Sequence, residues 1–138
     1  QTQLLRLQLA LERTFTRIAE RTGQPTIIIM DRGTMDGKGY VNDPAMWAAI
    51  MQKHDVDEAY LMGRYDAIVH LATAADGAAQ FYKSGKVTDD SGATVFRRES
   101  PEEALDLDLK MRACWQQHPE HHVITNDFDS FRCKLETA

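Results

Sequence analysis

The stretch that most constrains the fold is an apolar run that ends in charged residues. Segment 26–30 reads Thr-Ile-Ile-Ile-Met and continues directly into Asp31, Arg32 and Gly33. A strand of a parallel sheet is covered on both faces, so it reads as continuous apolar residues, and α/β enzymes place charged groups at its carboxyl end. The run therefore predicts a buried strand with chemistry at its end, although Asp-x-Gly is an equally common turn after a strand.

Composition predicts one globular domain over residues 1–138. A chain of 138 residues with 43% hydrophobic content can bury a single core. The net charge of −5 disfavours a general nucleic-acid binder. No apolar run reaches the roughly 20 residues that span a bilayer, and the opening segment carries too many charges for a secretory signal. We therefore expect a cytoplasmic protein. Two variants of this expectation are a protein that is peripheral to membranes and a protein that is part of a larger assembly.

A helix is predicted before the apolar run. Gly23 and Pro25 are typical of a helix end. Because the chain starts at Gln1 inside this helix, we expect it to be part of a longer protein. Apolar residues recur at every third or fourth position, which predicts one buried face: Leu4, Leu7, Leu11, Phe15 and Ile18.

Two later helices carry start signals. Asp43 and Pro44 are typical of an N-cap and first turn, and Ser100-Pro101 begins a helix that we expect to reach about residue 117. In that helix we expect Ala104, Leu105, Leu109, Ala113 and Trp115 to face inward and the pairs Asp106/Lys110 and Asp108/Arg112 to lie outside.

Two more strands are predicted, over 65–72 and 121–127, so that helices and strands alternate as in an α/β fold. Segment 73–98 is rich in small and polar residues and predicts a lid-like loop with a short extended piece at 94–96. Segment 33–40 predicts a glycine-rich loop, but it does not match the phosphate-binding loop. Three residues rather than four separate Gly33 from Gly37, and Lys38 is followed by glycine instead of Ser or Thr.

Taken in order, these pieces resemble a known family. The chain is similar to the AAA-type ATPase/kinase domain shared by the bacterial NadR ribosylnicotinamide kinase and the eukaryotic TRPL translocation defect proteins. The resemblance spans nearly the whole chain, and it rests on Asp31-Arg32-Gly33 with Asp36, Tyr65 to Leu71 with Thr73-Ala74-Ala75, Arg97-Arg98-Glu99, Leu107-Asp108, Trp115, His118-Pro119 and Ile124-Thr125-Asn126.

The resemblance implies an α/β fold, a three-layer P-loop kinase-like sandwich with a mainly parallel sheet that is incomplete at the N-terminus. An opening strand and the Walker A loop are not among residues 1–138, so an N-terminal segment of the same protein is the implied partner. In such sheets the opening strand lies between the strand that ends in Asp31 and the strand that ends near Ala72. Segments 27–30 and 67–71 should then share no ladder, while 67–71 should pair in parallel with 122–125.

The resemblance also implies roles at the end of the first strand. Asp31 would be the carboxylate near Mg²⁺ and the acceptor, and Arg32 would steady phosphate. Asp36 and Tyr40 would face the acceptor pocket.

Three residues beyond this group complete the implied site. Arg97 and Arg98 occupy the place of lid arginines that close over the transferring phosphoryl group. From the residues alone they are a solvated cluster that pairs with nearby glutamates. Asn126 would begin the loop that contacts the base, or would simply form a turn.

Several functions remain open at this point. The resemblance implies binding of GTP or ATP with Mg²⁺, in a nucleotide-dependent module that binds phosphoinositide or a protein partner and acts in trafficking. The alternatives are a small-molecule, nucleoside-type kinase that transfers the γ-phosphoryl group of ATP, and a catalytically degenerate scaffold in a large assembly.

Overall fold

A computed structural model describes residues 1–41, 43–88, 92, 94–128 and 130–138, without the side chains of residues 87, 95 and 97. The chain forms two compact units, Gln1–Tyr65 and Asp66–Ala138. Each unit is described by itself, and the single domain over 1–138 stays a prediction. None of the helices in the described ranges is both long and apolar enough to cross a membrane.

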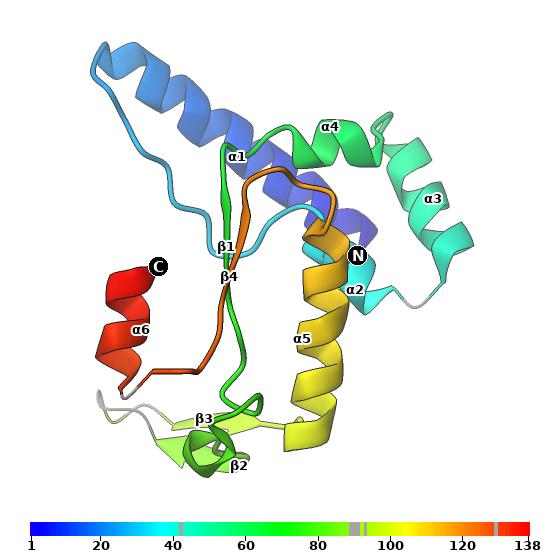
Figure 1. Ribbon diagram of the computed structural model, residues 1–138. Coiled ribbons are helices and arrows are strands. Elements are labelled where there is room, and N and C mark those ends of the chain that lie inside the picture. The colour runs from blue at the N-terminus through cyan, green and yellow to red at the C-terminus, as the bar shows by residue number, and fades with distance from the viewer. Residues whose placement is uncertain (42, 89–91, 93, 129) are drawn as a thin grey trace. The chain divides into compact units, whose positions relative to one another are not determined.

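The first unit is helical (Figure 1). Its helices are α1 (Thr2–Thr22), α2 (Asp36–Tyr40), α3 (Pro44–Lys53) and α4 (Glu58–Met62). The predicted ends are confirmed: Gly23 closes α1 in the left-handed conformation, and the Asp43 side chain accepts a hydrogen bond from the Ala45 N–H at the start of α3. The apolar core of this unit consists of Leu5, Met35, Trp47, Ile50 and Leu61.

The predicted buried face of α1 is wrong. The helix buries Leu5 and Glu12 instead, because a second face with the same spacing packs against the rest of the unit. The predicted residues are each about half exposed: Leu4, Leu7, Leu11, Phe15 and Ile18.

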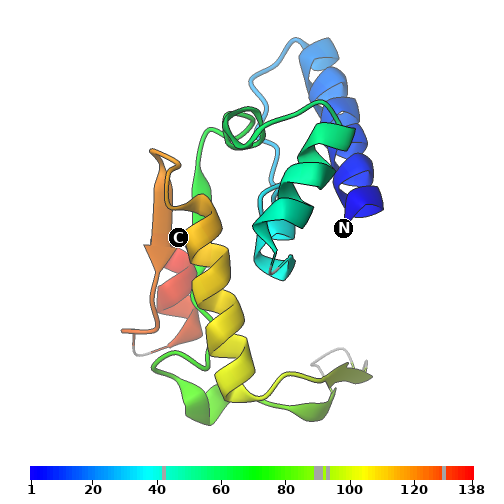
Figure 2. The same cartoon turned by 90° about the vertical axis from the view of Figure 1, so that its right-hand side faces the viewer.

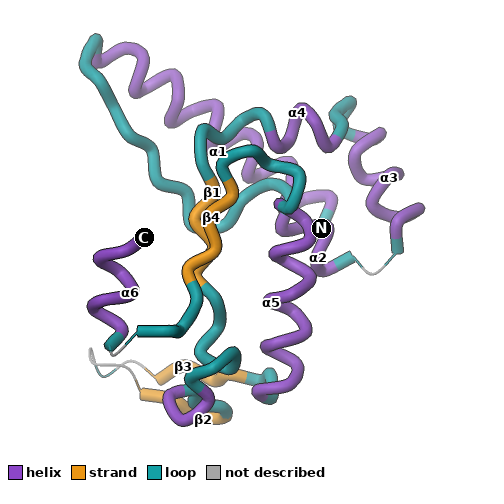
Figure 3. Tube along the Cα trace, in the orientation of Figure 1, coloured by secondary structure: helices purple, strands orange, loops and turns teal. Residues whose placement is uncertain are grey.

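The predicted buried strand over 26–30 is also wrong. The segment is extended but pairs with no other described segment. Ile27 and Ile29 are 88% and 89% exposed. A strand needs a ladder partner and cover on its faces to become buried, and the described residues of this unit supply neither. Figure 3 shows the segment as part of the loop between α1 and α2.

The second unit contains a parallel strand pair, β1 (Ile68–Leu71) and β4 (His121–Ile124). Ile68 lies opposite His121 and Leu71 opposite Ile124. The predicted parallel pairing of these two segments is therefore confirmed. Helices α5 (Pro101–Trp115) and α6 (Phe131–Thr137) lie on opposite sides of the pair (Figure 1, Figure 2). The mixture of helices with a small parallel sheet confirms the α/β fold class.

Segment 73–98 contains more regular structure than the sequence predicts. A short 3-10 helix, η1 (Ala79–Phe81), precedes an antiparallel hairpin of β2 (Gly85–Thr88) and β3 (Thr94–Arg97). The extended piece at 94–96 is confirmed, whereas its partner strand was missed. The role of this segment as a lid stays a prediction.

Helix α5 starts as predicted but turns a different face inward. Ser100 and Glu103 form a complete capping box. The pair Asp106/Lys110 lies at the surface as predicted. Asp108, expected outside, is only 8% exposed, and Leu109, expected inside, is more than half exposed. Asp108 turns inward because it has polar partners there, which compensate a buried charge.

Candidate functional site

The charged turn after segment 26–30 has an unusual backbone. Arg32 adopts a φ of 76°, in the left-handed region that favours glycine. Two contacts hold it there: Gln8 of α1 donates a hydrogen bond of 2.7 Å to the Arg32 carbonyl, and the Asp36 carboxylate accepts one of 3.2 Å from the Gly33 N–H. Side chains of Gln8 and Asp36 therefore fix the backbone of the turn at Arg32 and Gly33.

Strain at Arg32 gives a prediction. Arg32→Gly should raise the free energy of unfolding by about 1 kcal/mol, because a residue with a Cβ atom is strained at positive φ and glycine is not. Urea denaturation monitors the change. Arg32→Ala keeps the Cβ atom and is the matched control, for which we expect no gain. An equal gain in both variants would show that loss of the charge, rather than relief of strain, is responsible.

Asp36 begins helix α2, a short helix in segment 33–40 that was predicted to be a loop. Its carboxylate also lies 3.9 Å from Arg32 Nη1, an ion pair that the partly exposed setting keeps weak. The ring of Trp47 lies close to Gly37, where an added Cβ atom would come within 3.1 Å of it. Close packing of Gly37 on Trp47 thus fixes α2, and with it Asp36 and Tyr40.

Four of the predicted site residues surround one cleft in the first unit. The cleft has a volume of about 530 Å³, and Asp31, Arg32, Asp36 and Tyr40 line it. The structure thus brings together the residues that the resemblance places near metal, phosphate and acceptor. The exposed apolar side chains of α1 line the same cleft, together with Met30 and Trp47: Leu4, Leu7, Leu11 and Phe15.

A buried polar network beside this cleft was missed. Glu12 is 4% exposed; its Oε2 accepts a hydrogen bond of 2.8 Å from Arg64 Nε, and its Oε1 accepts one of 2.6 Å from the Tyr65 hydroxyl. The Tyr65 hydroxyl accepts one of 2.7 Å from the Thr34 N–H. Burial, followed by the hydrogen bond to Glu12, raises the pKa of Tyr65. Glu12 lies on the same face of α1 as Leu5, and this spacing is the sequence feature from which the burial of Glu12 could have been predicted.

The remaining predicted residues belong to the second unit. The backbone of Arg97 ends β3, opposite Gly85, and the Arg98 side chain is exposed. The structure does not describe the side chain of Arg97, so its predicted contacts lie outside the described residues. Asn126 follows β4, and its side-chain amide donates to the carbonyls of Thr73 and Asp76 at 2.7 and 2.6 Å. Its amide nitrogen is thus engaged within the protein.

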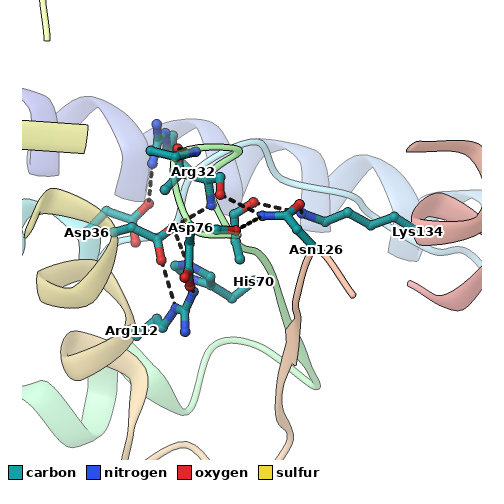
Figure 4. Close-up of polar contacts among 11 residues, drawn as sticks. Arg32, Asp36, His70, Asp76, Arg112, Asn126 and Lys134 are labelled. Carbon is teal, nitrogen blue, oxygen red and sulfur yellow. Dashed lines mark hydrogen bonds and ion pairs between the residues drawn. The ribbon is translucent and has the colours of Figure 1, made fainter. Parts of the chain in front are cut away.

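A second network at the carboxyl end of β1 was also missed (Figure 4). Oδ1 of the buried Asp108 accepts hydrogen bonds of 3.0 Å from the Thr73 N–H and from His70 Nε2. Arg112 lies 2.8 Å from Asp108 Oδ2 and donates to Asp76 at 2.9 Å. His70 thus has a hydrogen-bond partner for its Nε2 atom. The i,i+4 spacing of Asp108 and Arg112 predicted their pairing but not its burial.

Comparison with known proteins identifies the family. The model of the AAA domain family matches residues 1–130. No curated protein and no solved structure shows significant similarity to the chain. The family match supports nucleotide binding by a P-loop-like domain, in agreement with the α/β fold and with polar residues at the carboxyl end of a parallel strand. The chain therefore belongs to the AAA domain family of P-loop NTPase-like proteins.

Proposed function

We propose that the protein binds a purine nucleotide, GTP or ATP, with Mg²⁺, in the manner of the NadR and TRPL translocation defect proteins. The observation that carries this proposal is the cleft lined by Asp31, Arg32, Asp36 and Tyr40. A carboxylate, a guanidinium group and a tyrosine around one cleft can contact metal, phosphate and acceptor together. The trafficking role and the binding of phosphoinositide or a protein partner belong to the same hypothesis.

The Asp31 carboxylate suits a magnesium ion. It is exposed, and no hydrogen bond or ion pair joins it to another described residue. No group of three or more candidate metal ligands gathers in the described part of the chain. Such a group is not required, because Mg²⁺ in nucleotide sites takes one or two carboxylates and fills its other positions with phosphate oxygens and water. When bound, the ion would neutralise charge on the phosphates.

The other residues have complementary roles in this proposal. Arg32 offers a planar fork of N–H donors to phosphate oxygens. Asp36 and Tyr40 contact the acceptor, with Asp36 fixed by the Gly33 N–H. Arg97 and Arg98 are the lid cations, which stabilise charge on the transferring group once water is excluded.

Residues outside 1–138 complete this site in our proposal. The glycine-rich segment 33–40 lacks the spacing of a phosphate-binding loop, and segment 26–30 exposes Ile27 and Ile29 without a ladder partner in the described residues. An apolar strand from the same protein that leads into such a loop would pair with segment 26–30. It would also cover the apolar side chains of α1.

Substitution of Asp31 in the full-length protein tests the proposal. Asp31→Ala should reduce nucleotide-dependent turnover about a hundredfold or more, because the carboxylate that would hold Mg²⁺ is lost, and with it the charge stabilisation that the ion would supply. The free energy of unfolding should change by less than about 1 kcal/mol, as expected for an exposed side chain. Calorimetric titration with Mg²⁺-ATP and Mg²⁺-GTP identifies the preferred base.

Asp66→Ala is the matched control, since Asp66 is also exposed but precedes β1 at its amino end. Arg97→Ala should resemble Asp31→Ala. If Asp31→Ala and Asp66→Ala behave alike, Asp31 has no role in the site. If the wild-type protein binds neither nucleotide, the scaffold hypothesis replaces this proposal.

The cleft also supports a second candidate, a small-molecule kinase. Its apolar lining from α1, with Tyr40 and Trp47, suits the body of a nucleoside-type acceptor, and Asp31 and Asp36 would orient the acceptor hydroxyl. A kinase should consume ATP only when an acceptor nucleoside is present, and the acceptor should gain a phosphate detectable by mass spectrometry. ATP consumption that no acceptor accelerates would favour the binding module.

A further inference from the structure

The turn after β1 is held by side chains from three other segments. Asp108 of α5 accepts from the Thr73 N–H, and Asn126, after β4, donates to the carbonyls of Thr73 and Asp76. Lys134 of α6 donates to the Ala72 carbonyl at 2.7 Å. The turn 72–76 therefore has one backbone N–H and three carbonyls bound by side chains that are distant in sequence, which fixes its conformation.

Lys134 is the most unusual member of this set. It is 4% exposed, and its ammonium group contacts the Ala72 carbonyl and, at 2.6 Å, Asn126 Oδ1. Neither of these partners is a carboxylate. Desolvation by burial lowers the pKa of Lys134, while the more distant Asp108 opposes this. A buried charge without a paired carboxylate is costly, and an apolar side chain of similar length would pack at lower cost. Packing alone therefore does not account for a lysine at this position.

Contact with Lys134 determines the orientation of Asn126. An ammonium group has only donors, so the Asn126 side chain must turn its oxygen toward Lys134. Its nitrogen then faces the carbonyls of Thr73 and Asp76, as observed (Figure 4). Lys134 thus acts on the turn twice, directly at Ala72 and indirectly through the amide of Asn126.

The turn 72–76 lies where a fixed backbone conformation can serve ligand binding. It lies at the carboxyl end of a parallel strand, where ligands of α/β sheets bind, and the chain continues from it through Gly77 into η1 and the β2–β3 hairpin. A site at a strand end needs supporting side chains to hold its backbone in place.

We propose that Lys134 is a positioning residue of a ligand site at the carboxyl end of β1, where it holds the turn 72–76 in one conformation through Ala72 and Asn126. This inference rests on the proposed nucleotide-binding function. Its test measures the turn and the affinity separately, in the full-length protein.

Hydrogen exchange reports on the turn. The N–H groups of Thr73, Asp76 and Ala78 are hydrogen-bonded within it or to Asp108. In Lys134→Met they should exchange about tenfold faster, as expected for the loss of a hydrogen bond, while the amides of β1 and β4 stay protected. Affinity for Mg²⁺-ATP or Mg²⁺-GTP should fall about tenfold or more, as for other groups that support a ligand contact.

Two further variants make the result decisive. Lys110→Met removes a lysine that α5 holds at the surface beside Asp106, and it should leave exchange and affinity unchanged. Asn126→Asp keeps a partner for Lys134 but removes both donors to the turn, so its turn amides should also exchange faster. If Lys134→Met destabilises the whole second unit, Asn126→Asp alone decides the question.

The inference is overturned if the turn amides of Lys134→Met and Asn126→Asp exchange at the wild-type rate, or if they exchange faster while nucleotide affinity is unchanged. Failure of the proposed function looks different, because the wild-type protein then binds neither nucleotide. In that case exchange still shows whether Lys134 holds the turn, and the link to a nucleotide site is refuted.

Discussion

Replacing Glu12 with glutamine should lower the free energy of unfolding of the first unit by about 3 kcal/mol, because removal of one partner leaves a largely buried charge uncompensated. Glu12 is 4% exposed and lies within 2.8 Å of both Arg64 and Tyr65. Glutamine has a similar shape, but its amide N–H₂ group would face either the guanidinium group of Arg64 or the hydroxyl that Tyr65 now donates. The loss is therefore electrostatic rather than a change of packing.

Tryptophan fluorescence can assign this loss to the first unit. The chain has two tryptophans, and both are buried, Trp47 in the first unit and Trp115 in the second. In a Trp115→Phe background, urea unfolding followed by fluorescence reports on Trp47. Glu20→Gln is the matched control, since Glu20 is an exposed glutamate of the same helix, and it should change stability by less than about 0.5 kcal/mol.

A double variant separates charge from shape. Arg64→Met together with Glu12→Gln should recover part of the lost stability, because neither charge is then left alone. An effect of Glu12→Gln no larger than that of Glu20→Gln would mean that the Glu12 carboxylate is not buried beside Arg64 in the protein.

The predictions from sequence were most accurate where a few adjacent residues determine the structure. The helix starts at Asp43 and Ser100 and the left-handed end of α1 at Gly23 all formed as predicted. Capping uses backbone groups within one helical turn, so it depends little on the rest of the chain. The parallel pairing of β1 with β4 was also predictable, because it followed from the order of the elements in the resembled family.

Prediction failed where burial depends on distant partners. Segment 26–30 is apolar enough for a strand, yet Ile27 and Ile29 remain exposed without a neighbouring strand in the described residues. Helix α1 buries the face that carries Leu5 and Glu12 rather than its more apolar face, and periodicity alone cannot decide which face packs against the rest of the unit. Glu12 lies on the face that packs, so a charged residue is buried there. The sequence pattern had instead predicted burial of the face that carries Leu4, Leu7 and Leu11.

The candidate site was predictable only in part for the same reason. Asp31, Arg32, Asp36 and Tyr40 lie close in sequence, and their grouping around one cleft follows from a single turn and a short helix. The contacts of Asp108 with Thr73 and of Lys134 with Ala72 join residues that are 35 and 62 positions apart, and the spacing of polar residues gives no signal for them.

The largest effect in the second unit is expected for Asp108→Asn, which should lower the free energy of unfolding by about 3 kcal/mol. The carboxylate accepts from the Thr73 N–H and from His70 on one oxygen and lies 2.8 Å from Arg112 on the other. Asparagine can keep the first two contacts through its oxygen. Its nitrogen must then face the guanidinium group, which has only donors, and Arg112 is left with Asp76 alone.

Fluorescence of Trp115 in a Trp47→Phe background follows the second unit during urea unfolding. Asp106→Asn is the matched control, because Asp106 lies two residues earlier on the same helix and pairs with Lys110 at the surface. It should cost less than about 0.5 kcal/mol. Asp108→Asn should also speed exchange of the Thr73 N–H, because a hydrogen bond to a neutral oxygen is weaker than one to a carboxylate. If both asparagine variants unfold at the same urea concentration, Asp108 contributes no more than a surface acid, and the network at the end of β1 does not stabilise the unit.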